Sequence, residues 1–325
     1  MNANRTRATA VCLAVAVLTG CASTQSAMFR GGAGHDGVYA EVPGPEQPIE
    51  RAWQHASGAP SYSSPTVTAG RVYFGNSDGL LVALERATGE VAWRRELGST
   101  IEAAPAVAGE RVIVATWDGV VRAVRGASGK PAWRFETGGM AYSAPTVTED
   151  RVYFGSADGR VYALERGSGE LVWRFRAGDG VYSSPSVAEG RVYFASLDGN
   201  VYAVSADTGE EIWRFATDKP MFASPAVADG VVAIGGYDRS MYLLNAASGS
   251  RIWRFRTGNR IYASAALTRE SVVFASTDGY VYSVARDNGI KNWDFQTGDK
   301  VYSSPALANG TVHVGGRNGR LYALD

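Results

Sequence analysis

Residues 182–217 read YSSPSVAEGRVYFASLDGNVYAVSADTGEEIWRFAT, and this stretch decides the fold. It holds four short apolar runs, which are Tyr182–Val187, Arg191–Ala195, Asn200–Val204 and Glu211–Phe215. Runs of five or six residues rich in Val, Tyr, Phe and Trp have the length and composition of β-strands. Asp198-Gly199 between the second and third runs favours a tight hairpin, because a type I′ turn needs positive φ at both central residues. The stretch therefore predicts four antiparallel strands.

Tryptophan recurs every forty residues along the chain, at Trp53, Trp93, Trp133, Trp173, Trp213, Trp253 and Trp293. A fixed period of this length indicates one supersecondary unit copied along the chain. Four strands per unit, with no helical stretch between them, are typical of a β-propeller blade. The first-strand motif occurs seven times, whereas the tryptophan strand is missing after Asp325. We therefore predict an all-β, seven-bladed propeller in which Glu50–Gln54 supplies the last strand and closes the ring.

The stretch Ala83–Trp93, ALERATGEVAW, resembles the tryptophan-docking motif of the PQQ-like (quinoprotein-type) propeller family, and it recurs before Trp173 and Trp213. The resemblance covers roughly residues 50–325. It implies that the seven tryptophans are structural, each wedged against the neighbouring blade. Among lipoproteins, the chain resembles the family of the outer-membrane protein assembly factor BamB.

The N-terminus has the features of a lipoprotein signal. Arg5 and Arg7 precede an apolar run from Ala8 to Leu18, which is too short to span a membrane. The run ends in Leu18-Thr19-Gly20-Cys21, which resembles a bacterial lipobox. We expect residues 1–20 to be a signal peptide and Cys21 to be lipidated (palmitate among its acyl chains). Ala22 after the cysteine leads us to expect the outer membrane, on its periplasmic side.

Residues 21–48 are predicted to be a lipidated tether, and residues 49–325 the propeller. The tether is rich in Gly and Pro, with a patch from Met28 to Tyr39 that either docks on the propeller flank or is disordered. Cys12 and Cys21 are the only cysteines in the sequence, so the mature domain has no disulfide and no thiol chemistry.

Charge argues against nucleic acid as a partner. The 32 basic and 32 acidic residues balance, and loss of Arg5 and Arg7 with the signal leaves the domain slightly acidic. Nucleic-acid binding needs a basic face. We expect a monomeric propeller whose partners are envelope proteins.

Catalytic motifs are missing from the sequence. A quinone-dependent dehydrogenase of the resembled family would carry a vicinal cysteine pair and long inserted loops, whereas every repeat here spans forty residues. We therefore expect no enzyme activity and no cofactor, PQQ included. His35, His55 and His313 are scattered, and no metal site is expected. The aspartates of the Asp-Gly turns are interpreted as a turn requirement copied by duplication.

Residues that do not repeat are the better candidates for function, since whatever the fold needs recurs in every blade. Around the hairpin turns the side chains vary, and the candidates for a partner-binding rim are Trp117, Leu197, Tyr237, Arg317 and Arg320. Their mixture of aromatic, aliphatic and Arg side chains resembles interface composition. Drift of solvated loop tips is the alternative. In the channel-lining strand, Glu102 replaces an aromatic residue; it is either a ligand group or a hydrated substitution.

The sequence favours a non-catalytic scaffold that faces the periplasm and holds other proteins by its rim. The resemblance to the BamB family implies a role in outer-membrane β-barrel assembly, with the assembly machinery as partner. The alternatives are a propeller that binds a small ligand or cell-wall glycan, and a quinone-dependent dehydrogenase.

Overall fold

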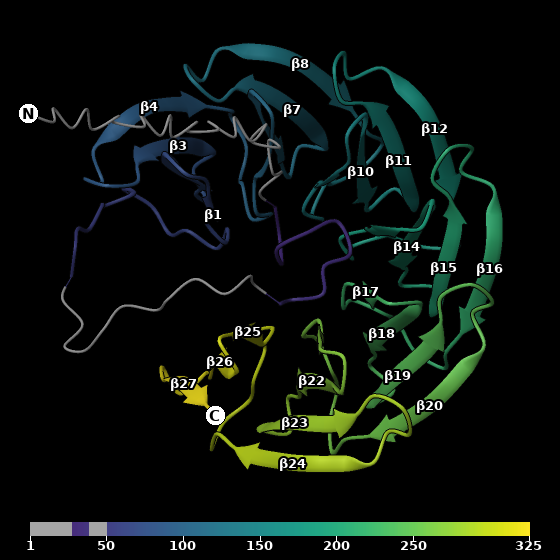
Figure 1. The fold of residues 1–325 in the computed structure, drawn as a ribbon. Coiled ribbons are helices and arrows are strands. Elements are labelled where there is room, and N and C mark those ends of the chain that lie inside the picture. Colours follow the sequence, from purple (N-terminus) through teal and green to yellow (C-terminus); the bar gives the residue numbers. More distant parts are fainter. Residues whose placement is uncertain (1–27, 39–50) are drawn as a thin grey trace, which may run out of the picture.

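The computed structural model describes residues 28–38 and 51–325, which contain 27 β-strands and no helix. The strands form seven antiparallel sheets, arranged around a central channel like the blades of a propeller (Figure 1). Within each sheet the strands follow chain order from the channel outward. The predicted all-β, seven-bladed architecture is confirmed.

The strands take four positions in a blade. The innermost are β1 (Thr66–Val67), β5 (Ala106–Ala108), β9 (Thr146–Val147), β13 (Ser186–Ala188), β17 (Ala226–Ala228), β21 (Ala266–Leu267) and β25 (Ala306–Ala308). The second are β2 (Arg71–Gly75), β6 (Arg111–Ala115), β10 (Arg151–Ser156), β14 (Arg191–Ala195), β18 (Val231–Gly235), β22 (Ser271–Ala275) and β26 (Thr311–Gly315). The third are β3 (Leu80–Glu85), β7 (Val120–Arg125), β11 (Arg160–Glu165), β15 (Asn200–Ser205), β19 (Ser240–Asn245), β23 (Tyr280–Ala285) and β27 (Leu321–Leu324). The outermost are β4 (Val91–Glu96), β8 (Pro131–Glu136), β12 (Leu171–Arg176), β16 (Glu211–Ala216), β20 (Arg251–Arg256) and β24 (Lys291–Gln296).

The second and third strands carry the core. Val192, Tyr193 and Phe194 are consecutive in β14, and each is fully buried. Successive side chains of a strand point to opposite faces, so both faces of the blade are covered by its neighbours. The outermost strand is more open: in β16 only Trp213 is buried and most of the other side chains reach solvent. The core is therefore a stack of blade-to-blade contacts.

The tryptophans of β4, β8, β12, β16 and β20 dock on the following blade. Trp293 of β24 was predicted to dock in the same way, but its indole makes no such hydrogen bond within the described residues. In the fourth blade the Trp213 Nε1 donates to the carbonyl oxygen of Ala246 at 2.9 Å. The indole ring covers Gly249, where φ is +71° and a Cβ would lie 2.6 Å from the ring. Only glycine fits there, which explains the Ser-Gly and Thr-Gly pairs of the repeat. The same bond to the residue 33 positions later is made by Trp53, Trp93, Trp133, Trp173 and Trp253.

A second set of contacts joins the blades near the channel. The backbone N–H of Ser184 donates to the hydroxyl of Ser224 at 2.9 Å, and that of Ser224 donates to Ser264 at 3.2 Å. The series continues from Ser264 to Ser304. Each bond spans forty residues, so the serine of the repeat links one blade to the next.

The predicted closing strand is not formed. The seventh sheet has three strands, β25, β26 and β27, and residues 51–54, the described part of the predicted strand, adopt no strand conformation. Trp53 nevertheless docks on the first blade, because its Nε1 donates to the carbonyl oxygen of Arg86 at 2.9 Å. This docking holds the segment against blade 1, and no ladder to β27 accompanies it. The tryptophan contact was predicted correctly and the strand pairing was not.

Residues 28–38 lie inside the ring, where Figure 1 shows them as a purple trace at its centre. The prediction that this patch docks on the flank or is disordered is therefore wrong. Inner-strand N–H groups donate to its backbone: Val187 to Ala33 at 2.6 Å, Val227 to Gly34 at 2.8 Å, Leu267 to Asp36 at 2.8 Å and Leu307 to Gly37 at 3.1 Å. The donors are spaced by forty residues, one from each of four consecutive blades. We call residues 28–38 the channel segment.

The composition of the channel segment suits this position. A Cβ on Gly34 would lie 2.5 Å from the carbonyl oxygen of Val227, so a side chain there would push the segment off the strand. At the N-terminal end Met28 is buried with Ala104 and Ala106 of the second blade. Arg30 is buried and donates to the backbone carbonyls of His35, Ala265 and Pro305. Contacts to the channel segment thus reach from the second blade to the seventh.

Candidate interaction surface and channel mouth

The hairpin turns between second and third strands all lie on one face of the ring. The N–H of Trp117 donates to the carbonyl oxygen of Thr100 at 3.1 Å, and the N–H of Leu197 donates to Gly180 at 2.9 Å. The equivalent bond, to the residue 17 positions earlier, is made in all seven blades at Ser77, Trp117, Ala157, Leu197, Tyr237, Thr277 and Arg317. The linker that enters each blade therefore lies beside its own hairpin tip. We call this side of the ring the tip face.

Side chains on the tip face differ in exposure. The Trp117 side chain is 41% exposed, although an indole of this size is usually more buried, and Leu197 is half-buried. Arg317 and Arg320 flank the turn of the seventh blade and are both exposed. These four side chains lie apart from one another on the tip face. Within the described residues, no ring contact or hydrogen bond joins any two of them. The tip face thus presents spaced contact points on a rigid frame.

An aromatic belt surrounds the mouth of the channel on the tip face. It consists of the residues that open each first-strand motif: Tyr62, Tyr142, Tyr182, Phe222, Tyr262 and Tyr302. From Tyr142 to Tyr302 each ring contacts the next, with centroids 5.6 Å apart for Tyr142 and Tyr182 and 5.2 Å apart for Tyr262 and Tyr302. Tyr62 makes no ring contact with the other described members. Tyr62, Tyr142 and Tyr302 are exposed. The belt offers flat apolar surfaces on which another ring or a sugar could stack.

Tyr237 joins this belt from its hairpin tip. Its ring stacks on Phe222 with centroids 4.5 Å apart and contacts Tyr262 at 4.6 Å. The guanidinium of Arg260 lies over the Tyr237 ring at 4.9 Å, a cation–π contact. Burial and a hydrogen bond with Tyr262 raise the pKa of the Tyr237 hydroxyl above its ordinary value. Arg260 was not predicted from the sequence. Its linker position does not repeat and is basic only here and at Lys300, which is the signal that could have revealed it.

Glu102 takes the position in the belt that aromatic residues occupy in the other blades. Its side chain is half-buried. Burial raises the pKa of Tyr142, and the negative charge of Glu102 adds to that effect. The carboxylate therefore lies within electrostatic reach of the next residue of the belt. This gives the mouth one acidic side among aromatic ones.

The aspartates of the hairpin turns have partners within their own blades. The Tyr162 hydroxyl donates to Asp158 at 2.5 Å, and the N–H of Gly138 donates to the same carboxylate at 2.9 Å. Burial raises the pKa of Tyr162 to about 12, and the bond to Asp158 adds to it. Tyr202 and Asp198 repeat the arrangement at 2.7 Å. These carboxylates thus accept hydrogen bonds that hold the turn and the neighbouring tyrosine in place.

Within residues 28–38 and 51–325, no group of three or more His, Cys, Asp or Glu residues is placed to hold a metal ion. The same residues contain no helix long and apolar enough to cross a membrane. Cys21 and the predicted signal peptide lie outside the described residues.

The fold and its forty-residue repeat define a β-propeller protein with PQQ-like repeats. Residues 62–325 match the family model described as "Beta-alanine-activating enzyme, beta-propeller", and the chain belongs to this β-propeller family. No curated protein matches the sequence.

Two solved structures have similar folds. The crystal structure of BamB from Moraxella catarrhalis superposes with a TM-score of 0.74 at 20% identity, over 84% of this chain and 87% of that one. The computationally designed Ika8 protein also superposes with a TM-score of 0.74, at 17% identity, over 81% of this chain and 82% of that one. The chain is therefore a BamB-like propeller in its fold.

Proposed function

We propose that this protein is a non-catalytic scaffold that binds envelope proteins through its tip face. One observation carries the proposal: the seven hairpin tips are held on one face by the same backbone bond, whereas the side chains at those tips differ from blade to blade. A frame that repeats while its contact residues vary is suited to recognition, because loops on a rigid scaffold are where binding residues concentrate. Trp117, Leu197, Tyr237, Arg317 and Arg320 are the proposed contacts.

The proposal includes a cellular location. Lipidation of Cys21 would anchor the protein in the outer membrane on the periplasmic side, with residues 1–20 removed. A role in β-barrel assembly is part of the proposal, and the likeness in fold to BamB supports it. In that role the tip face would hold a component of the assembly machinery.

We propose no PQQ or other cofactor in the channel. The channel segment takes up the N–H groups of four consecutive inner strands, so those polar groups are engaged by the chain itself. Both cysteines precede residue 22, outside the repeats. A cofactor bound to these inner strands would first have to displace residues 33–37.

Binding of a cell-wall glycan is the second candidate, and the aromatic belt favours it. Tyr62 and Tyr302, on either side of the seam between the first and last blades, are both exposed. Exposed rings of this kind suit stacking on sugars. Retention of the wild-type protein on purified peptidoglycan, with loss of retention in Tyr302→Ala, is the result that this candidate requires.

Photo-crosslinking from single positions tests the scaffold. A photoreactive amino acid replaces Trp117 or Leu197 in the full-length protein within its own membrane, and the adducts are identified by mass spectrometry. The matched control is Ile212 on β16, an apolar side chain that is 44% exposed away from the hairpin tips. Discrete adducts at the tips and none at Ile212 are expected. Adducts with the β-barrel insertase would support the assembly role, and equal labelling at all three positions would contradict a tip-face scaffold.

A further inference from the structure

The space between neighbouring blades is filled by a recurring pair of rings. In the contact between the second and third blades, Phe135 of β8 packs on Tyr162 of β11 with centroids 5.4 Å apart. The same pair recurs as Phe175–Tyr202, Phe215–Tyr242, Phe255–Tyr282 and Phe295–Tyr322, at 5.2 to 5.5 Å. In three blades a third ring stacks beneath, as Phe154 does on Tyr162. Five consecutive blade contacts are thus sealed by aromatic side chains.

The contact between the first and second blades lacks all three rings. Arg95 stands where the phenylalanine would be, Arg122 stands where the tyrosine would be, and Val114 replaces the ring beneath. Arginine cannot replace stacked rings, because its charged head group must stay hydrated or paired. A groove of about 390 Å³ opens at this place, lined by Leu97, Val124, Pro131 and Trp133 together with the two arginines.

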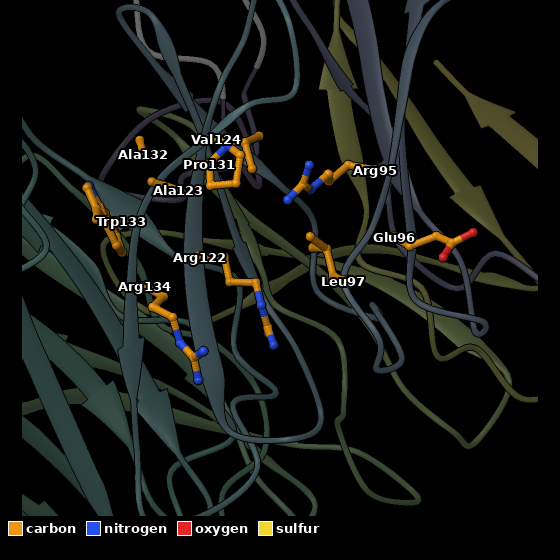
Figure 2. A pocket seen from close by; sticks show the side chains of 10 residues that line it. All are labelled: Arg95, Glu96, Leu97, Arg122, Ala123, Val124, Pro131, Ala132, Trp133 and Arg134. Carbon is orange, nitrogen blue, oxygen red and sulfur yellow. The ribbon is translucent and has the colours of Figure 1, made fainter.

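The charges around the groove are unevenly compensated. Arg122 donates to Asp118 at 2.8 Å and to the Thr116 hydroxyl at 2.5 Å, which balances its charge and fixes its direction. Arg134 at the rim is paired with Glu136. The guanidinium of Arg95 makes no hydrogen bond or ion pair with any residue of the described part of the chain. Glu96 also lines the groove, but its side chain points away from Arg95 (Figure 2).

Figure 2 shows how the two walls face one another. Arg95 of β4 and Leu97, which directly follows β4, lie on one side, and Arg122, Pro131 and Trp133 come from the second blade on the other. The volume is within the range of small-ligand pockets, about 300 to 1,000 Å³, and apolar walls with a few directed polar groups are typical of them. The lining is therefore complementary to a ligand that has an apolar ring and one negative charge.

We propose that this groove binds a carboxylate that carries an aromatic ring. The ring would occupy the space that Phe and Tyr fill in the other blades, against Leu97, Val124 and Trp133. The carboxylate would pair with Arg95, whose planar guanidinium matches a carboxylate in a bidentate geometry. A single negative charge suffices because Arg122 and Arg134 already have acidic partners. The ligand is either a free aromatic acid or an acidic residue beside a phenylalanine in a peptide, and the site is independent of the tip face.

Titration calorimetry on the full-length protein tests the site with defined probes. The free acid is 3-phenylpropionate, and the peptide is acetyl-Glu-Phe-amide. Propionate without the ring and 3-phenylpropanol without the charge serve as matched probes that should not bind measurably. Saturable binding of either primary probe is expected, and the probe that binds identifies the source of the ligand.

Variants show whether the binding takes place in the groove. Arg95→Gln should weaken the affinity about tenfold, as expected for the loss of a charge-assisted hydrogen bond. Arg94→Gln removes the same charge from the preceding residue of β4, which points to the opposite side of the strand, and should leave the affinity unchanged. The double variant Arg95→Phe/Arg122→Tyr restores the ring pair; it should abolish binding and unfold at a higher temperature. Absence of saturable binding by both primary probes, or equal affinity in the wild type and Arg95→Gln, would overturn the proposal.

Discussion

The Nε2 atom of His35 lies 3.0 Å from the hydroxyl oxygen of Thr146, which is 111 residues away in the sequence. The Thr146 hydroxyl gives its own hydrogen to the carbonyl oxygen of Pro185, so it accepts from His35. His35 is therefore protonated on Nε2, and its buried Nδ1 has no partner among residues 28–38 and 51–325. A second proton on Nδ1 would have no acceptor, and burial together with the charge of Arg30 lowers the pKa of His35 to about 3.

This pKa predicts acid sensitivity. The folded value of about 3 lies below the ordinary value of 6.5, so protons bind the unfolded chain more tightly. The stability that a neutral His35 contributes is complete above pH 6.5 and falls as the pH decreases toward 3, by at most about 1.4 kcal/mol per pH unit. Melting temperatures between pH 7 and pH 5 should fall less steeply in His35→Gln than in the wild type. The control His313→Gln should keep the wild-type slope, and equal slopes for all three proteins would contradict the buried neutral imidazole.

The docked tryptophans predict a graded loss of stability. Trp93→Ala should lower the free energy of unfolding by about 3 kcal/mol, because a large ring and its bond to the carbonyl oxygen of Gly126 at 2.7 Å are both lost. The partly buried Trp293 indole makes no such hydrogen bond within the described residues, and Trp293→Ala should cost less. Urea unfolding of the two variants side by side measures the difference. A larger loss in Trp293→Ala would show that inter-blade docking is not what the tryptophans contribute.

Arg239 predicts a stabilising substitution. It has a φ of +65° at a turn position where the other blades have glycine, such as Gly199 with a φ of +86°. A side chain in this left-handed region costs about 1 kcal/mol, so Arg239→Gly should raise the stability by up to that amount. The reverse change, Gly199→Ala, should lower it. Thermal unfolding checks both, and a decrease in Arg239→Gly would mean that the Arg239 side chain makes a compensating contact.

Two tip residues predict different outcomes for the same substitution. Trp117→Asp should leave the stability within about 0.5 kcal/mol of the wild type, because the exposed indole has few contacts to lose. Tyr237→Asp should cost about 2 kcal/mol, because it removes the stacking on Phe222 and the tilted ring contact with Tyr262. Loss of crosslinked partners in Trp117→Asp, with unchanged melting, would separate recognition from folding. Loss of melting temperature in Trp117→Asp would place that side chain in the fold instead.

Much of the fold could be predicted because its determinants are local and repeat. Gly199 and Trp213 mark a turn and a docking site by residue type alone, and the forty-residue period gives the number of blades. The hairpin tips could be found in the same way. The tryptophan motif predicts the docking of Trp53 but not a strand pairing between β27 and residues 51–54, because the docking does not require that pairing.

The channel segment could not be predicted because it has no apolar period. Its hydrogen bonds run from backbone N–H groups, such as those of Val187 and Val227, to backbone oxygens. Almost every residue type has these groups, so the sequence does not show which of them are paired. The groove between the first and second blades had a visible signal. Arg95 and Arg122 depart from the repeat, but their meaning depends on knowing that the two positions face one another across a blade contact.

The length of the channel segment also limits how many blades the ring can have. The backbone from Ala33 to Gly37 meets the inner strands of the fourth to the seventh blade in order, and Met28 is buried against the second. Repeat proteins gain and lose units by duplication and deletion of whole modules, since each unit contacts only its neighbours. Here one extra blade would widen the ring, and the segment could no longer reach from one end of its path to the other. A short glycine-rich stretch thus ties the number of blades to a fixed length, and a change in one would require a matching change in the other.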